Sequence, residues 1–89
     1  MTEIHDNREG SRFELAVEGH IAFAAYERTN DRIVFTHTIV PRELAGRGVG
    51  TRLIEGALAQ VRDEGLKVVP QCAFVAAYLT KHPEAAEVA

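Results

Sequence analysis

A glycine-rich segment with two nearby arginines is the part of this sequence best suited to binding chemistry. Gly46, Gly48 and Gly50 fall within five residues, and Arg47 and Arg52 lie beside them. Glycine lets the backbone approach a ligand closely and adopt positive φ values. A pattern of helical spacing follows at once, and the unpaired N–H groups and dipole of a helix N-terminus favour an anion. Because arginine can bind phosphate through two N–H groups, the segment predicts a phosphate-binding loop.

Three known phosphate-binding patterns do not fit this segment. A P-loop requires a Lys-Ser/Thr pair after its last glycine, but Thr51-Arg52 follows Gly50. The dinucleotide pattern G-x-G-x-x-G requires a glycine at position 51, and a kinase glycine loop lies in a hairpin. The remaining G-x-G-x-G pattern has a simpler alternative, in which its glycines only permit close packing of a helix on a sheet.

Cys72 and His37 are further candidates for chemistry, and each has a structural alternative. Cys72, the only cysteine, precedes a predicted helix whose dipole would favour a thiolate, but a lone cysteine is more often a small buried apolar residue. His37 alternates with Ile33, Phe35 and Ile39. We therefore expect it on a buried sheet face with a backbone hydrogen bond, although it could serve as a general base. A single cysteine and four scattered histidines predict no disulfide and no metal site.

The first half of the chain predicts the strands that lead to these residues. Apolar residues alternate with polar ones, or β-branched and aromatic residues cluster, over three segments: residues 12–18, 21–26 and 32–40. Gly19-His20 is the expected first connection and Thr29-Asn30-Asp31 the second. Three strands in meander order are predicted.

The second half predicts helices. Apolar residues from Val49 to Val61 repeat with helical spacing, and Gly65 is placed to end that helix. A short buried strand is predicted over 66–69 and a second helix over 73–82, with a frayed end beyond them. The predicted order is βββαβα, an α+β fold with one mixed sheet. The strands before and after the first helix should pair in parallel.

Length and composition limit the classes of protein that remain. The 89 residues, 46% of them hydrophobic, are ordinary for one globular domain and too few for a TIM barrel or a full dinucleotide-binding domain. The net charge of −3 gives no support for nucleic-acid binding. We expect a cytoplasmic protein without a membrane segment, present as a monomer or a weak homodimer.

The glycine segment and the C-terminal third resemble a known family. A strand, then Arg/Gln-x-x-Gly-x-Gly/Ala, then a helix is the acetyl-coenzyme A pyrophosphate motif of the GCN5-related N-acetyltransferases. Gly48 and Gly50 occupy its glycine places, and Ala45 replaces its Arg/Gln, a departure that Arg47 would partly offset. The stretch 68–84, VVPQCAFVAAYLTKHPE, resembles the small single-domain branch of that family. The resemblance implies one domain over 1–89, with an ordered core of about 12–84 and without the substrate-binding helices of larger members.

This resemblance implies acetyl-coenzyme A as cofactor and suggests a role for several residues. The pyrophosphate would be bound by the loop and the first helical turn, formed by Gly46, Arg47, Gly48, Val49, Gly50, Thr51 and Arg52. The pantetheine arm would run along strand 32–40, where an N–H at Ile39 or Val40 would polarise the thioester carbonyl. Tyr78 matches the family's general-acid tyrosine, unless its ring only packs in the core. The resemblance thus adds Tyr78 to Cys72 and His37 as catalytic candidates.

Three functions remain open on this sequence. The first is an acetyl-coenzyme A-dependent transferase acting on an amine of a small molecule or a peptide. The second is a non-catalytic module that binds coenzyme A or acyl-coenzyme A. The third is a structural domain whose glycine loop binds nothing. Binding of acetyl-coenzyme A separates the third function from the others, and turnover separates the first from the second.

Overall fold

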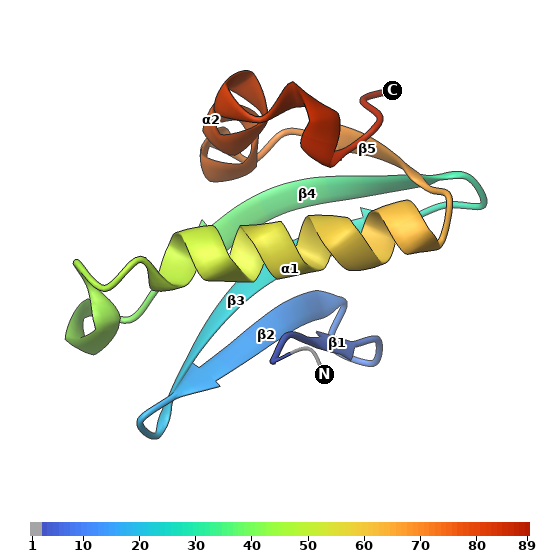
Figure 1. Ribbon diagram of the computed structural model, residues 1–89. Helices are drawn as coiled ribbons and strands as arrows, with labels where there is room; N and C mark the ends of the chain where they lie inside the picture. The colour runs from blue at the N-terminus through green and yellow to red at the C-terminus, as the bar shows by residue number, and fades with distance from the viewer. Residues whose placement is uncertain (1–2) are drawn as a thin grey trace.

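The computed structural model describes residues 3–89 as one sheet with helices packed against it (Figure 1). The strands are β1 (His5–Asn7), β2 (Arg12–Val17), β3 (His20–Arg28), β4 (Arg32–Ile39) and β5 (Lys67–Pro70). The helices are α1 (Val49–Asp63) and α2 (Ala73–Lys81), with short 3-10 turns η1 (Arg42–Leu44) and η2 (Pro83–Ala85). The expected α+β class is confirmed.

The sheet is mixed, in the spatial order β1-β2-β3-β4-β5. Neighbouring strands are antiparallel except β4 and β5, which pair in parallel from Arg32↔Lys67 to Phe35↔Pro70. The parallel pair spans α1, as a strand–helix–strand connection requires, so that expectation is confirmed. The β2–β3 turn is centred one residue earlier than expected, on Glu18 and Gly19, because Val17 already pairs with His20 and both turn residues have positive φ.

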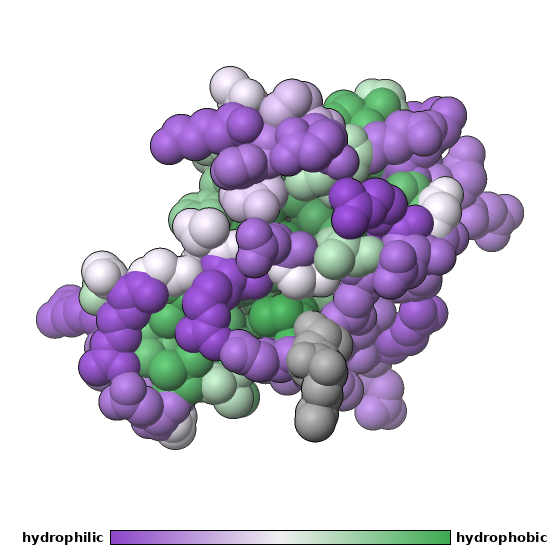
Figure 2. Space-filling view, viewed as in Figure 1, coloured by the Kyte–Doolittle hydropathy of each residue, from purple (hydrophilic) through white to green (hydrophobic). Residues whose placement is uncertain are grey.

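The core lies between α1 and one face of the sheet. Figure 1 shows α1 crossing that face, with α2 beside the β4–β5 side of the sheet. Alternate strand residues and the apolar stripe of α1 meet there, with these large side chains almost fully buried: Phe13, Phe35, Leu15, Ile33, Leu44, Leu53, Ile54 and Leu58. Figure 2 shows mostly hydrophilic residues on the outside of the α1 side, with hydrophobic residues visible in the hollows.

Both ends of the chain contribute to the core more than the sequence indicated. Strand β1 was not predicted, and Ile4 just before it is buried. At the other end, the expected fraying is wrong, because Val68 forms a parallel bridge with Val88. The Val68 N–H donates to the Glu87 backbone carbonyl at 2.8 Å, and Ala86 belongs to the core cluster. Buried residues therefore lie outside the range 12–84 at each end.

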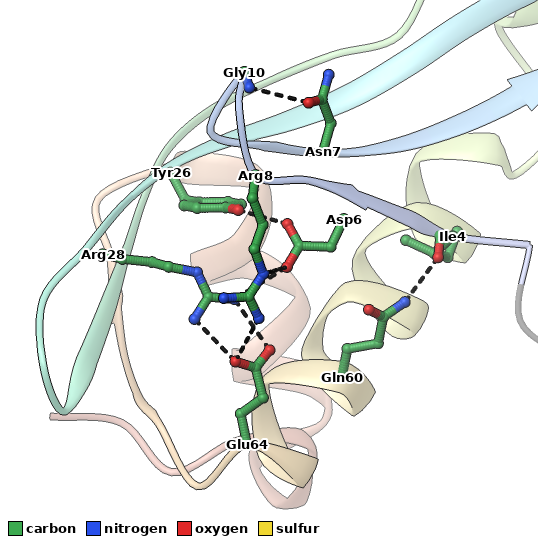
Figure 3. A network of polar contacts seen from close by, with 9 residues as sticks. All are labelled: Ile4, Asp6, Asn7, Arg8, Gly10, Tyr26, Arg28, Gln60 and Glu64. Atoms are coloured by element: carbon green, nitrogen blue, oxygen red, sulfur yellow. Dashed lines mark hydrogen bonds and ion pairs between the residues drawn. The ribbon is translucent and has the colours of Figure 1, made fainter.

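A network of hydrogen bonds and ion pairs links β1 to β3 and to the C-terminal end of α1 (Figure 3). The Arg28 guanidinium donates to Glu64 at 3.0 Å and to Asp6 at 3.1 Å, and Arg8 donates to Glu64 at 3.0 Å. The Tyr26 hydroxyl completes the network by donating to Asp6. The hydrogen bond from Arg28 lowers the pKa of the Glu64 carboxyl below its ordinary value.

The lowered Glu64 pKa predicts a loss of stability in acid. A carboxyl whose pKa is lower in the folded state stabilises the fold above its unfolded pKa, and that contribution disappears as pH falls through the folded pKa. We expect Glu64→Gln to cost about 1–2 kcal/mol at pH 7, because Arg28 loses its main partner. Between pH 7 and pH 3, the free energy of unfolding should also fall less in the variant than in wild type. Urea unfolding at both pH values measures this, with the exposed Glu87→Gln as control. An equal pH dependence in Glu64→Gln and wild type would contradict the assignment.

Gly56 of α1 provides a notch for Ile4. A Cβ added at Gly56 would lie 2.2 Å from Ile4 Cγ1 and 3.2 Å from Ile4 Cβ. The neighbouring Gln60 side chain donates to the Ile4 carbonyl at 2.8 Å, which holds the chain in the notch.

We expect Gly56→Ala to destabilise the protein by about 1–2 kcal/mol, because overpacking outweighs the gain of about 1 kcal/mol in helix propensity. Urea unfolding measures the change. In Ile4→Ala, where the clash is relieved, the same glycine substitution should be neutral or stabilising. Equal destabilisation in both backgrounds would show that Ile4 is not the obstacle.

Candidate functional site: a helix N-terminus, an open strand edge and a cysteine

The glycine loop leads directly into an uncapped helix N-terminus. Gly48 is the N-cap of α1, with φ 71° and ψ 16° in the left-handed region that favours glycine. The first regular helical bond runs from the Arg52 N–H to the Gly48 carbonyl at 3.1 Å. Within residues 3–89, no side chain caps this N-terminus, and its first turn contains no acidic residue. The free N–H groups and the dipole therefore favour an anion at this point.

A pocket of about 270 Å³ adjoins these N–H groups. It is bounded by the end of β4, the loop, the first turn of α1 and one residue of α2, and the residues that line it are Val40, Leu44, Ala45, Gly46, Gly48, Val49, Gly50, Thr51 and Phe74. Five expected cofactor-binding loop residues therefore share one cavity with Val40, namely Gly46, Gly48, Val49, Gly50 and Thr51.

The three loop glycines have different structural roles. A Cβ at Gly50 would lie 2.7 Å from Phe74 Cζ and 3.3 Å from Val40 Cγ2, so Gly50 permits close packing of α1. Gly46 and Gly48 have open space beside them, and both have positive φ. Close packing therefore explains Gly50 but does not explain the other two glycines.

The two arginines expected beside the loop are engaged elsewhere. Arg47 forms an ion pair with Glu18 in the β2–β3 turn, and Arg52 forms one with Glu3. All four side chains are largely exposed, and exposed ion pairs contribute only about 0–1 kcal/mol. A bound phosphate could therefore replace Glu18 or Glu3 as the partner of these arginines. In the structure itself, the positive charges that the sequence predicted beside the loop are paired with the protein's own carboxylates.

Strands β4 and β5 separate next to the loop pocket. Their pairing ends at Phe35↔Pro70, after which the Cys72 N–H donates to the Phe35 carbonyl at 2.8 Å and α2 begins. In the described part of the chain, the edge of β4 from residue 36 to residue 39 has no strand on this side. That edge leads from Val40 at the loop pocket back to Cys72. An extended ligand can lie there and bond to the strand backbone.

Cys72 lies where this open edge begins. It is the N-cap of α2 and is 5% exposed. Its Sγ lies 3.2 Å from the hydroxyl oxygen of Thr38, on the helix-covered side of β4. Sequence reasoning missed Thr38, because the contact joins residues 34 positions apart. The Thr-His-Thr run at the end of the strand gave no indication of which side chain would face the cysteine.

The expected burial of His37 is wrong. The pairing of β3 and β4 shifts register between Ala25 and Tyr26. Ala25 pairs with His37, whereas the next residue, Tyr26, pairs with Phe35. The extra residue, Thr36, reverses the alternation beyond it. His37 is consequently exposed, on the sheet face away from α1.

The same shift places Ile39 on the face away from α1, where it is 47% exposed. On that face the His37 ring meets the edge of the Phe23 ring at a centroid distance of 6.0 Å, and His37 Nδ1 lies 3.3 Å from the Thr36 hydroxyl. An imidazole on this face is accessible to molecules that approach from solvent.

Tyr78 lies farther along α2, six residues after Cys72, which corresponds to about 9 Å of helix. Its ring packs on His82 at a centroid distance of 4.7 Å and is partly buried against the core. Burial raises the pKa of the Tyr78 hydroxyl above its ordinary value, and the charges of Glu55 and Glu84 raise it further. Tyr78 therefore remains protonated at neutral pH, with its hydroxyl in acidic surroundings.

None of the described helices is long and apolar enough to cross a membrane. Within residues 3–89, no group of three His, Cys, Asp or Glu side chains lies close enough together to hold a metal ion.

The fold and the site together define an α+β domain with a glycine-rich loop and an uncapped helix N-terminus beside a separated pair of parallel strands. The family model described as GCN5-related N-acetyl-transferase matches residues 12–88, and the chain belongs to that family. A comparison with curated proteins returned no match.

Proposed function

We propose that this protein is an acetyl-coenzyme A-dependent N-acetyltransferase that acts on an amine of a small molecule or a peptide. One observation carries the proposal. The uncapped N-terminus of α1 opens on a pocket lined by Val40, and the open edge of β4 leads from Val40 to Cys72. A diphosphate joined to an extended arm that ends in a thioester fits this sequence of features. Membership of the acetyltransferase family supports the same donor.

The loop and β4 would divide the binding of this donor between them. The N–H groups of the first turn of α1 would hold the diphosphate at Gly48, with Arg47 and Arg52 able to leave their exposed carboxylate partners for it. From Val40 to Phe35 the strand rises by roughly 16 Å, a length over which its free backbone groups can bind the amides of an extended arm. The N–H groups at Ile39 and Val40 are our candidates for contacts along this arm.

Cys72 is our candidate for the group beside the thioester carbon. In the proposed route, Cys72 Sγ attacks that carbon, and its proton passes to the departing coenzyme sulfur. The acceptor amine then attacks the acetyl-cysteine and displaces Sγ, which recovers a proton from the amine. Thr38, at 3.2 Å, holds Sγ in position and can donate a hydrogen bond to it when it is deprotonated.

His37 and Tyr78 would serve proton transfer in different ways. His37 is exposed on the sheet face away from α1, whereas Cys72 Sγ lies on the helix-covered side. His37 is therefore our candidate for a general base that accepts the amine proton through water at the open edge of β4. The protonated Tyr78 hydroxyl is the alternative proton donor to the leaving sulfur. Because Tyr78 lies six residues beyond Cys72 along the chain, Cys72 is the nearer of the two side chains to the open edge of β4.

Calorimetric titration with acetyl-coenzyme A, followed by an assay of thiol release with a panel of amines, tests the proposal. We expect binding and amine-dependent thiol release. Binding without turnover by any amine would instead favour a non-catalytic acyl-coenzyme A-binding module. Failure to bind acetyl-coenzyme A would remove both functions and leave a structural domain.

A further inference from the structure

The sheet face away from α1 is open to solvent next to the edge of β4 that the donor would follow. His37 and Ile39 of β4 are exposed on this face, and Ile21 of β3 is 46% exposed. In the proposed function, the arm of the donor takes the place of a strand beside residues 36–39, with Cys72 on the helix-covered side. A thioester in that place can also be reached from the open face. The acceptor amine can therefore approach across this face.

Strand pairing arranges three side chains of the open face in a row. Ala25 of β3 is the Cα partner of both Arg12 in β2 and His37 in β4. The Phe23 ring, on the same face of β3, connects the two ends of the row. Its centroid lies 4.4 Å from the guanidinium carbon of Arg12 and 6.0 Å from the centroid of the His37 ring. The row therefore joins a permanent cation to an imidazole over a small methyl group and an aromatic ring.

The Arg12 guanidinium is held in place but keeps free donors. Its Nε donates to Glu14 at 2.6 Å, and the Asn7 amide donates to the same carboxylate oxygen at 3.0 Å. The guanidinium forms no other hydrogen bond with residues 3–89, and the Arg12 side chain is 35% exposed. An arginine can bind two carboxylates at once, as Arg28 does in this protein. The Nη groups of Arg12 can therefore bind a carboxylate that comes from a ligand.

The row also sets the length of such a ligand. Arg12 and His37 lie two strand spacings apart, roughly 10 Å between their backbones. The Arg12 side chain reaches over the Phe23 ring and shortens this gap. An α-amine is attached to the carbon beside its own carboxylate and cannot span the gap, whereas an amine at the far end of a methylene chain can. That chain would bury apolar surface on Ala25 and Phe23.

We infer that the acceptor is an ω-amino carboxylate, with its carboxylate on Arg12 and its amine beside His37. The inference rests on the proposed function, because it assumes the thioester at the edge of β4. The new amide bond forms as the acetyl–sulfur bond to Cys72 breaks, and the proton that His37 takes from the amine returns to Sγ through water. The exposed Glu27, two residues after Ala25 on the same face, favours the amine end of this ligand over its carboxylate end.

Thiol release with two matched acceptors tests the carboxylate on the full chain. The compounds 6-aminohexanoate and 6-aminohexanamide share the amine and the chain, and they differ in charge at the far end. We expect kcat/KM to be about tenfold or more higher for 6-aminohexanoate, mainly through KM, because a charge-assisted contact to Arg12 is made only by the carboxylate. Alanine, whose α-amine cannot span the row, should be a poor acceptor.

Arg12→Gln should bring the ratio of the two kcat/KM values close to one. A loss of folded protein or of donor binding lowers both values alike, so the ratio reports recognition of the carboxylate. Arg32→Gln is the matched control and should keep the wild-type ratio, because Arg32 is an exposed arginine at the start of β4 that pairs with Asp31.

A second variant tests the path between the two ends of the row. Ala25→Leu places a larger side chain between Arg12 and His37, and it should raise KM for 6-aminohexanoate by about tenfold or more. Calorimetric titration should show an affinity for acetyl-coenzyme A within about twofold of wild type. Ala16→Leu is the control, because Ala16 is exposed on the same face but lies outside the row.

The outcomes separate this inference from the proposed function. If amines are acetylated but the two matched acceptors react equally, or if alanine is as good an acceptor as 6-aminohexanoate, the inference fails and the proposed function stands. A preference for the carboxylate that persists in Arg12→Gln, or an unchanged KM in Ala25→Leu, also overturns the inference. If no amine is acetylated, the inference and the proposed function fail together.

Discussion

Gly48→Asp should lower the affinity for acetyl-coenzyme A by about 100-fold or more, because two like charges about 4 Å apart near a protein surface repel by up to about 4 kcal/mol. Gly48 is the N-cap of α1, and the space beside its Cα is open, so the new carboxylate would lie where the diphosphate is expected. The same carboxylate could accept the free N–H groups of the first turn and so compete with the ligand. Calorimetric titration measures the loss.

Gly48→Asn is the matched control for this prediction. Asparagine has the same size and also tolerates the left-handed conformation, but it carries no charge. We expect a much smaller loss of affinity, and thermal unfolding should show similar stability for both variants. If Asp and Asn weaken binding equally, the loss comes from shape or capping rather than from repulsion of an anion. Unchanged binding in both variants would remove the loop from the cofactor site.

Cys72→Ala should reduce acetyl transfer by about 100-fold or more while leaving the affinity for acetyl-coenzyme A within about threefold, because it removes the proposed nucleophile and little of the binding surface. Mass spectrometry of wild type after incubation with acetyl-coenzyme A, without an amine, should show one acetyl group on Cys72. Normal turnover in the alanine variant, together with no acetyl group on wild type, would establish direct transfer from the thioester to the amine.

Thr38 provides a test of the cysteine that does not depend on turnover. Thr38→Val keeps the side-chain shape but removes the hydroxyl that lies 3.2 Å from Cys72 Sγ. We expect slower alkylation of Cys72 by iodoacetamide at a given pH, because the thiolate loses a hydrogen-bond donor. Thr38→Ser should retain the wild-type rate if the hydroxyl is responsible. Equal alkylation rates in all three proteins would assign Thr38 to packing alone.

The elements around the loop could be predicted because their signals are local. Alternation in 12–18 and 32–40, and helical spacing after Val49, each depend on neighbours within a few residues, and the structure has β2, β4 and α1 there. The parallel pairing of β4 with β5 followed from the connection through α1. Strand β1 has only three residues and no alternation long enough to detect, so it was missed.

The candidate site was predicted less completely, because several of its contacts join distant parts of the chain. The sequence located the glycine loop and Cys72, but the side chains that surround them depend on strand register. One bulge residue in β4 moved His37 and Ile39 to the face away from α1 and left Thr38 facing Cys72. The sequence around Thr36 contains no local pattern that predicts this bulge.

The sequence by itself determined the kind of fold and the place of the glycine-rich loop before α1, since glycine density and hydropathy period act through backbone conformation over a few residues. Only the tertiary structure decided how charge and reactivity are distributed around that loop. It paired Arg47 with Glu18 and Arg52 with Glu3, across 29 and 49 positions of sequence, and it brought Thr38 to Cys72. Such contacts depend on which surfaces meet when the sheet and helices pack, and many arrangements of the same local elements would give different partners.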